Sequence, residues 1–110
     1  MPINYKVLGQ INPSASGLTT LYTVPSGTQT ICSTLTVCNL STSTTFRIAI
    51  RPSGEAIANK HYFTYDSILG SNDSIMFTMG MSLNTSDVVS VYAASSGVSF
   101  SLFGSEITWV

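Results

Sequence analysis

The stretch FRIAIRPSG, residues 46–54, decides the fold. Its first six residues form two alternating sets, Phe46, Ile48 and Ile50 against Arg47, Ala49 and Arg51. This period of two is typical of a β-strand with one face toward a core and the other away from it. Pro52 has no backbone N–H for a sheet and is expected to end the strand. The sequence therefore predicts a half-buried strand whose outer face holds two of the chain's four basic residues.

The same spacing recurs along most of the chain, interrupted by turns rich in Gly, Pro, Asn and Ser. It predicts further strands near residues 5–8, 18–24, 30–40, 61–69, 72–81, 83–93 and 97–107. Residues 30–40 carry apolar groups in both alternating sets, Ile31, Leu35 and Val37 against Cys32 and Cys38. That pattern predicts a central strand covered on both faces. Only residues 53–61 have some helical character, for about one turn.

About eight short strands, with no helix long enough to connect parallel strands, predict an all-β fold. We expect a single antiparallel β-sandwich of Ig-like or jelly-roll type, with a small barrel as the competing architecture. No repeat, linker or charge run divides the sequence, so residues 1–110 are expected to form one domain.

The composition is unusually poor in charge. Only 8% of the 110 residues are charged, with a net charge of -1, against about 25% in a typical soluble domain. Roughly 30 serines and threonines supply the polar surface instead. Four basic residues argue against nucleic-acid binding, and weak repulsion between copies favours a protein that works in an assembly. The sequence shows no signal-peptide pattern. It also has no apolar run of ~18 residues, so we expect no membrane span.

The two cysteines are expected to be free, buried thiols. Cys32 and Cys38 lie in one predicted strand, where ~3.3 Å per residue separates their Cα atoms by roughly 20 Å. A disulfide tolerates no more than ~7 Å. Free thiols agree with folding in a reducing cytoplasm.

The sequence has few residues that could take part in catalysis, and we expect no enzymatic activity, no cofactor and no metal site. The single histidine, His61, is interpreted as a partly exposed strand residue. The carboxylates are dispersed and suit turns or the rim of a sheet: Glu55, Asp66, Asp73, Asp87 and Glu106. Two alternatives stay open, a calcium site built from loop carbonyls and Asp73 or Asp87, and a sugar platform formed by Tyr62, Phe63 and Tyr65.

A partner interface is predicted from the few cations and from the C-terminal end. Arg47, Arg51 and Lys60 form the only basic cluster, which can dock on a neighbour's carboxylates or carbonyls. The alternative is pairing with Glu55 or Asp66 inside the domain. Trp109 and Val110 give the chain an apolar end, expected to pack on a partner or back on the sandwich.

The segments FRIAIRP, ANKHY and VSFSLFG are the most distinctive within residues 18–107, which resemble small virion structural proteins of tailed bacteriophages, especially those of cyanobacteria and other aquatic bacteria. The resemblance implies a non-catalytic β-sandwich used in many copies on the virion, assembled in the host cytoplasm. It implies that Arg47 and Arg51 are contact residues on a repeated surface.

The first hypothesis from the resemblance is a head decoration, or cement, protein that braces the major capsid protein lattice, as a trimer or dimer. A neck, baseplate or tail-fibre component is the second hypothesis. A carbohydrate-binding or adhesion module is the third, and an enzyme using His61 is the fourth.

Overall fold

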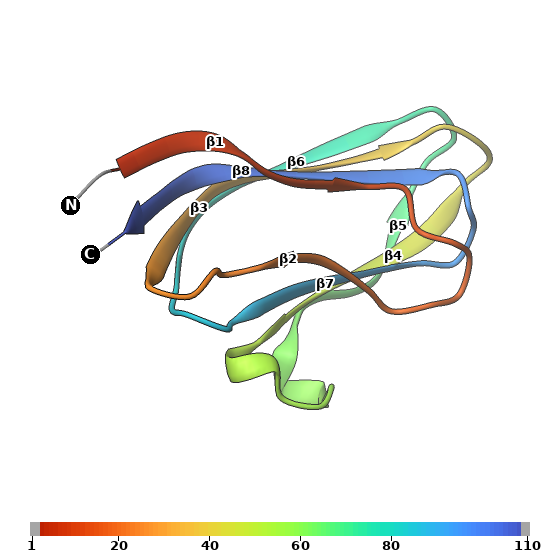
Figure 1. Ribbon diagram of the computed structural model, residues 1–110. Helices are drawn as coiled ribbons and strands as arrows, with labels where there is room; N and C mark the ends of the chain where they lie inside the picture. The colour runs from red at the N-terminus through yellow and green to blue at the C-terminus, as the bar shows by residue number, and fades with distance from the viewer. Residues whose placement is uncertain (1–2, 109–110) are drawn as a thin grey trace.

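The computed structural model describes residues 3–108, which form two four-stranded sheets packed face to face (Figure 1). The strands are β1 (Ile3–Ile11), β2 (Thr19–Thr23), β3 (Thr28–Asn39), β4 (Thr44–Arg51), β5 (Tyr62–Leu69), β6 (Ser74–Leu83), β7 (Val88–Ala93) and β8 (Val98–Thr108). Two short 3-10 turns, η1 (Pro52–Gly54) and η2 (Asn59–His61), lie between β4 and β5. The predicted all-β sandwich of eight strands is confirmed, and β4 ends directly before Pro52 as expected.

The order of the strands identifies the architecture. Sheet A has the order β1-β8-β3-β6 and sheet B the order β2-β7-β4-β5, with every neighbouring pair antiparallel. The chain pairs β1 with β8, β2 with β7, β3 with β6 and β4 with β5, as if one long hairpin were rolled into two layers. This is a jelly-roll arrangement, rather than the Ig-like or closed-barrel alternatives. Within the described chain, no helix is long and apolar enough to cross a membrane.

The core lies between the two sheets and is built from the alternating sets that the sequence predicts. Phe46 is fully buried at its centre, and its ring meets those of Phe77 at 6.2 Å and Phe100 at 6.3 Å in edge-to-face contacts. The other large side chains that are fully buried come from both layers: Leu35, Val37, Ile48, Leu69, Val89, Val91, Val98 and Leu102. Burial of these side chains is the main favourable term in folding.

Strand β3 differs from the prediction because it contains a bulge. Its pairing with β8 shifts between Cys32 and Thr34 and leaves Ser33 as an extra residue, which exchanges the two faces of the strand. Cys32 therefore points inward together with Leu35, whereas Ile31 lies on the outer face and is exposed. Strand β3 is central in sheet A, as predicted, but only one of its faces is covered by the other sheet.

Both cysteines are free, as predicted, but their surroundings differ. Cys32 is completely buried in the core, and this burial raises the pKa of its thiol to about 11. Cys38 lies beyond the Ser33 bulge and is only half-buried, which corrects the expectation that both thiols are buried. A thiol reacts as its thiolate, so the core cysteine is expected to be inert in the folded protein.

Iodoacetamide at pH 8 should therefore label Cys38 in the folded protein and leave Cys32 unlabelled until denaturant is added, as read by peptide mass spectrometry. The variant Cys38→Ser is the control, because its folded form should take up no label. Equal labelling of the two thiols in the folded protein would contradict the placement of the bulge.

Candidate functional site

His61 is buried, not the partly exposed strand residue that the sequence suggested. It ends the η2 turn, and its Nδ1 accepts a hydrogen bond of 3.0 Å from the backbone N–H of Ala58. With Nδ1 as acceptor, Nε2–H donates to Glu55 Oε1 at 3.2 Å. Both ring nitrogens thus hold the loop between β4 and β5 in shape, and this loop carries Asn59, one residue of a pocket described below.

Glu106 is also buried, which corrects the expectation that it lies at the rim. Its Oε2 accepts a hydrogen bond of 2.6 Å from the Tyr22 hydroxyl, and its Oε1 pairs with Lys6 Nζ at 3.2 Å. The Tyr22 hydroxyl also lies 2.7 Å from Thr30 Oγ1. Burial, followed by the hydrogen bond to Glu106, raises the pKa of Tyr22. This network joins strands β1, β2, β3 and β8 and so ties the two sheets together.

The carboxylates in two turns accept hydrogen bonds from backbone N–H groups. Asp87 accepts hydrogen bonds from the backbone N–H groups of Ser53 at 2.9 Å and Asn84 at 2.8 Å, and Asp73 accepts one from Ser74 at 2.8 Å. Between Ile3 and Thr108, no three His, Cys, Asp or Glu side chains gather in a way that could hold a metal ion. In this part of the chain, neither Asp73 nor Asp87 therefore belongs to such a cluster, and the calcium alternative gains no support from one.

Arg47 takes the within-domain alternative left open by the sequence. It donates two hydrogen bonds to Asp66, from Nε at 2.5 Å and from Nη2 at 3.2 Å. Its guanidinium also lies between two tyrosine rings, 4.1 Å from the centre of Tyr65 and 4.2 Å from that of Tyr92. The hydrogen bonds to Asp66 raise the pKa of Arg47. This arginine is therefore held rigidly on the outer face of sheet B.

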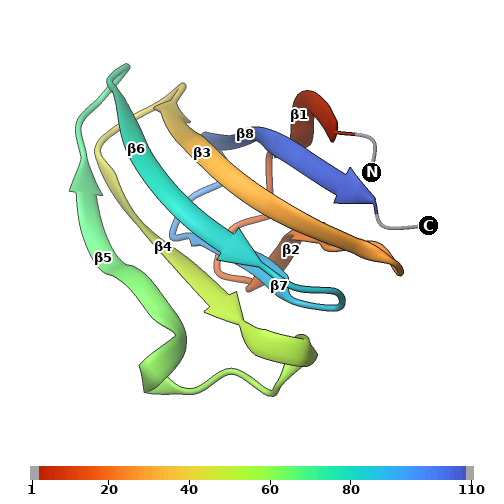
Figure 2. The ribbon, with the colours of Figure 1, turned by 90° about the vertical axis from the view of Figure 1, so that its left-hand side faces the viewer.

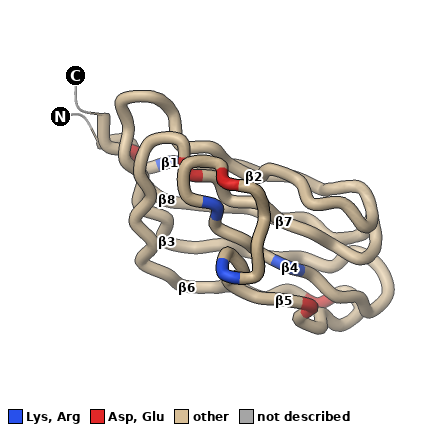
Figure 3. The backbone as a smooth tube through the Cα atoms, turned by 90° about the horizontal axis from the view of Figure 1, so that it is seen from below, with Lys and Arg blue, Asp and Glu red and all other residues tan. Residues whose placement is uncertain are grey.

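The other two predicted contact cations are engaged more loosely. Arg51 donates to Ser90 Oγ at 3.1 Å and to the backbone carbonyl of Glu55 at 3.0 Å. Lys60 Nζ lies 3.6 Å from Glu55 Oε1, and both side chains are largely exposed. Figure 3 shows charged residues of both signs distributed along the sandwich. The predicted contact residues Trp109 and Val110 lie outside the described residues.

The predicted sugar platform is rearranged. Phe63 packs against Phe77 with ring centres 5.4 Å apart, so it belongs to the contact between the sheets at their edges. Tyr62 and Tyr65 instead meet each other with ring centres 4.8 Å apart and line an open pocket of about 330 Å³ together with Asn59. Asn59 was not singled out from the sequence, because nothing in its local pattern places it beside the two tyrosines.

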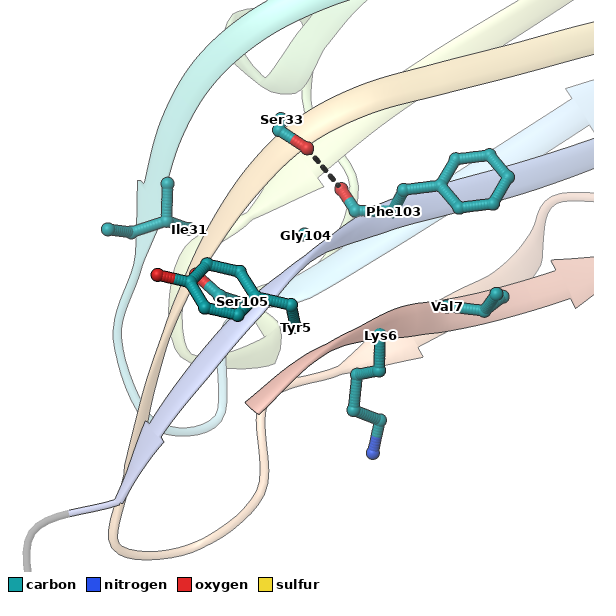
Figure 4. A pocket seen from close by; sticks show the side chains of 8 residues that line it. All are labelled: Tyr5, Lys6, Val7, Ile31, Ser33, Phe103, Gly104 and Ser105. Atoms are coloured by element: carbon teal, nitrogen blue, oxygen red, sulfur yellow. Dashed lines mark hydrogen bonds between the residues drawn. The ribbon is translucent and has the colours of Figure 1, made fainter. Parts of the chain in front are cut away.

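Sheet A carries an apolar outer surface that the sequence did not reveal. We call it the β1–β8–β3 face, formed by Ile3, Tyr5, Val7, Ile31, Phe103 and Ile107. The register explains it, since Ile3 pairs with Ile107 and Val7 with Phe103, all pointing away from the core. Tyr5 is 84% exposed and borders a shallow hollow of about 540 Å³ (Figure 4). Lys6 points away from this hollow, toward Glu106.

A scan against protein-family models finds no match, and a search of curated protein sequences finds none either. Among solved structures, this chain is similar in fold to a chain of the "Acidic stable capsid structure of Helicobacter pylori bacteriophage KHP30". The TM-score is 0.52 at 12% sequence identity, over 97% of this chain and 94% of that chain. The likeness is therefore one of fold, and it extends over nearly the whole of two chains of similar length.

Proposed function

We propose that this protein is a non-enzymatic structural component of a bacteriophage virion, and specifically a decoration protein that binds the outer surface of the capsid shell. The observation that carries the proposal is the fold likeness over nearly all of both chains to a chain in a phage capsid structure. The two chains share the fold and are of similar length, so the chain from the capsid structure is likewise about the size of one small sandwich. A domain of this size suits an accessory protein of a shell. The sequence resemblance to phage virion proteins, drawn from residues alone, supports the same class.

The side chains that an enzyme would use are engaged in the fold. His61 shapes a loop, Glu106 joins the two sheets, and Asp66 holds Arg47. This use of the titratable groups supports a structural role over hydrolysis at His61.

The β1–β8–β3 face is the surface that we assign to the shell. It is apolar, lies on a rigid sheet and has Tyr5 as an exposed aromatic anchor, the kind of residue that dominates protein interfaces. The sandwich measures 46 × 27 × 20 Å, so its broad face can supply the ~800 Å² per partner that a stable interface needs. On a lattice, a modest gain per copy is multiplied by the number of copies.

Purified protein should co-sediment with empty, expanded shells assembled from the major capsid protein of the phage that encodes it. Tyr5→Asp places a charge in the contact without disturbing the core and should weaken binding at least about tenfold. Ile68→Asp is the control, because Ile68 is another highly exposed hydrophobic side chain, 76% exposed, on strand β5 of the opposite sheet. It should bind as the parent protein does.

Two outcomes would overturn parts of this proposal. If the parent protein fails to bind shells, the decoration role is lost, and a neck, baseplate or tail-fibre position takes its place. If Tyr5→Asp binds like the parent while Arg51→Ala does not, docking uses the basic residues of sheet B. The interface role of Arg47, Arg51 and Lys60 stays a prediction until then, as do the dimer or trimer and the aquatic host.

A further inference from the structure

Strand β5 is an edge strand of sheet B with two irregularities in its pairing to β4 (Figure 2). Ala49 pairs with Tyr62 and Ile48 with Thr64, and the next pair is Phe46 with Ser67. Each of these steps leaves one extra residue on β5. Bulges of this kind bend an edge strand and redirect its side chains, and they are frequent beside binding sites.

The consequence is that two tyrosines share one side of the strand. Residues three apart in a regular strand face opposite sides, so Tyr62 and Tyr65 would be separated by the sheet. The bulges instead bring their rings to a centre distance of 4.8 Å at an interplanar angle of 86°. Two aromatic walls thus stand at a right angle around the pocket that Asn59 completes.

The backbone beside this pocket is strained and held in place. Asp66 has a φ of 50°, a left-handed conformation that is uncommon for a residue other than glycine. Its carboxylate is fixed by the two hydrogen bonds from Arg47, whose guanidinium also lies on the ring of Tyr65. Such strained residues persist where surrounding contacts determine them, and they concentrate at ligand sites. The Tyr65 wall is therefore fixed before any ligand arrives.

The chemistry of the pocket selects its ligand class. Two tyrosine rings offer apolar surface with polar hydroxyls, and the exposed Asn59 amide offers both a donor and an acceptor. A pyranose ring matches this set, because one of its faces presents C–H groups and its rim presents hydroxyls. The two cations next to the pocket residues are both paired: Arg47, which lies on the ring of Tyr65, pairs with Asp66, and Lys60, which follows Asn59 in the chain, pairs with Glu55. This pairing favours a neutral sugar over an acidic one.

We propose that the pocket formed by Asn59, Tyr62 and Tyr65 binds one neutral hexopyranose unit of a polysaccharide, with the sugar ring against the tyrosine rings and its hydroxyls toward Asn59. Tyr65 contacts Arg47 on the outer face of sheet B, so the pocket lies on the side of the sandwich away from the β1–β8–β3 face, and a copy bound to a shell through sheet A presents it outward. The binding itself belongs to this chain alone and does not depend on the proposed function.

The test is a titration of the ¹⁵N-labelled protein with the methyl glycosides of glucose, mannose, galactose and N-acetylglucosamine, followed by amide NMR. At least one should give saturable shifts confined to residues 59–66, with a Kd on the order of 1–10 mM for a single sugar unit. Tyr65→Ala should weaken that binding at least about tenfold, and Asn59→Ala should also weaken it. Tyr5→Ala, which removes an exposed tyrosine on the opposite sheet, should leave it unchanged.

The spectra also show whether each variant is folded. If Tyr65→Ala loses its dispersed spectrum, the decision passes to Asn59→Ala, whose residue is exposed and outside the core. No saturable shift with any of the four sugars up to about 100 mM would overturn the proposal. Unchanged affinity in folded Tyr65→Ala and Asn59→Ala would overturn it as well.

Discussion

Gly104→Ala is expected to destabilise the protein by about 3 kcal/mol, although it adds only one methyl group. Gly104 lies on β8 opposite Cys32, beside the Ser33 bulge. A Cβ at this position would lie 2.1 Å from the carbonyl oxygen of Ile31 and 3.0 Å from the Cα of Cys32. Both are backbone atoms of the neighbouring strand and cannot rotate away, so β3 and β8 would have to separate.

The measurement is the midpoint of urea unfolding, read together with the slope to show that the transition stays two-state. Gly80→Ala is the matched control in the same sheet, because nothing lies within 4 Å of a Cβ there, and it should change stability by less than about 0.5 kcal/mol. Equal midpoints for the two variants would contradict the placement of the bulge. Gly104 also lines the hollow beside Tyr5, so the substitution should weaken shell binding too.

Phe46→Ala is expected to cost about 3–5 kcal/mol, a large fraction of the stability of a small domain. Phe46 is completely buried, and truncating it removes both the transfer energy of the ring and its contacts with Phe77 and Phe100. Side chains from the inner faces of both sheets form the core, and the rigid sheets limit how far the resulting cavity can collapse.

Thermal unfolding followed by circular dichroism measures this effect. Phe63→Ala is the control, because Phe63 touches the same Phe77 ring but is 44% exposed at the edge of sheet B. Its loss should cost less than half as much. A similar fall in Tm for both variants would place the centre of the core elsewhere.

The sequence predicts the architecture well where the period of two is unbroken. In β8 the alternating sets from Val98 to Phe103 match the buried and outward faces, and Pro52 marks the end of β4. In β4 the prediction holds for Phe46, Ile48 and the two arginines, but Ala49 of the outward set is buried and Ile50 of the inward set is only half-buried. In strand β3 the alternation does not predict the faces correctly, because one inserted residue, Ser33, exchanges them without any change in composition. Arg47 can pair with Asp66 because β4 and β5 are neighbouring strands. The local sequence pattern does not indicate which strands are neighbours.

The surfaces of interest were less predictable than the fold, for two physical reasons. Outward apolar residues on β1 have the same alternation as inward ones, so the β1–β8–β3 face looks like core in the sequence. Glu106 is buried beside Tyr22, which is distant in the chain, and Tyr62 meets Tyr65 only because β5 bulges against β4. Tertiary contacts of this kind leave no signal in local spacing.

The most direct test of the decoration role is the number of copies per particle, measured by quantitative mass spectrometry of purified virions against the major capsid protein. A ratio of one to one, or a simple fraction of it, is the result that we predict, because a decoration protein occupies every equivalent position of the lattice. A few copies per particle, or none, would contradict the assignment to the shell.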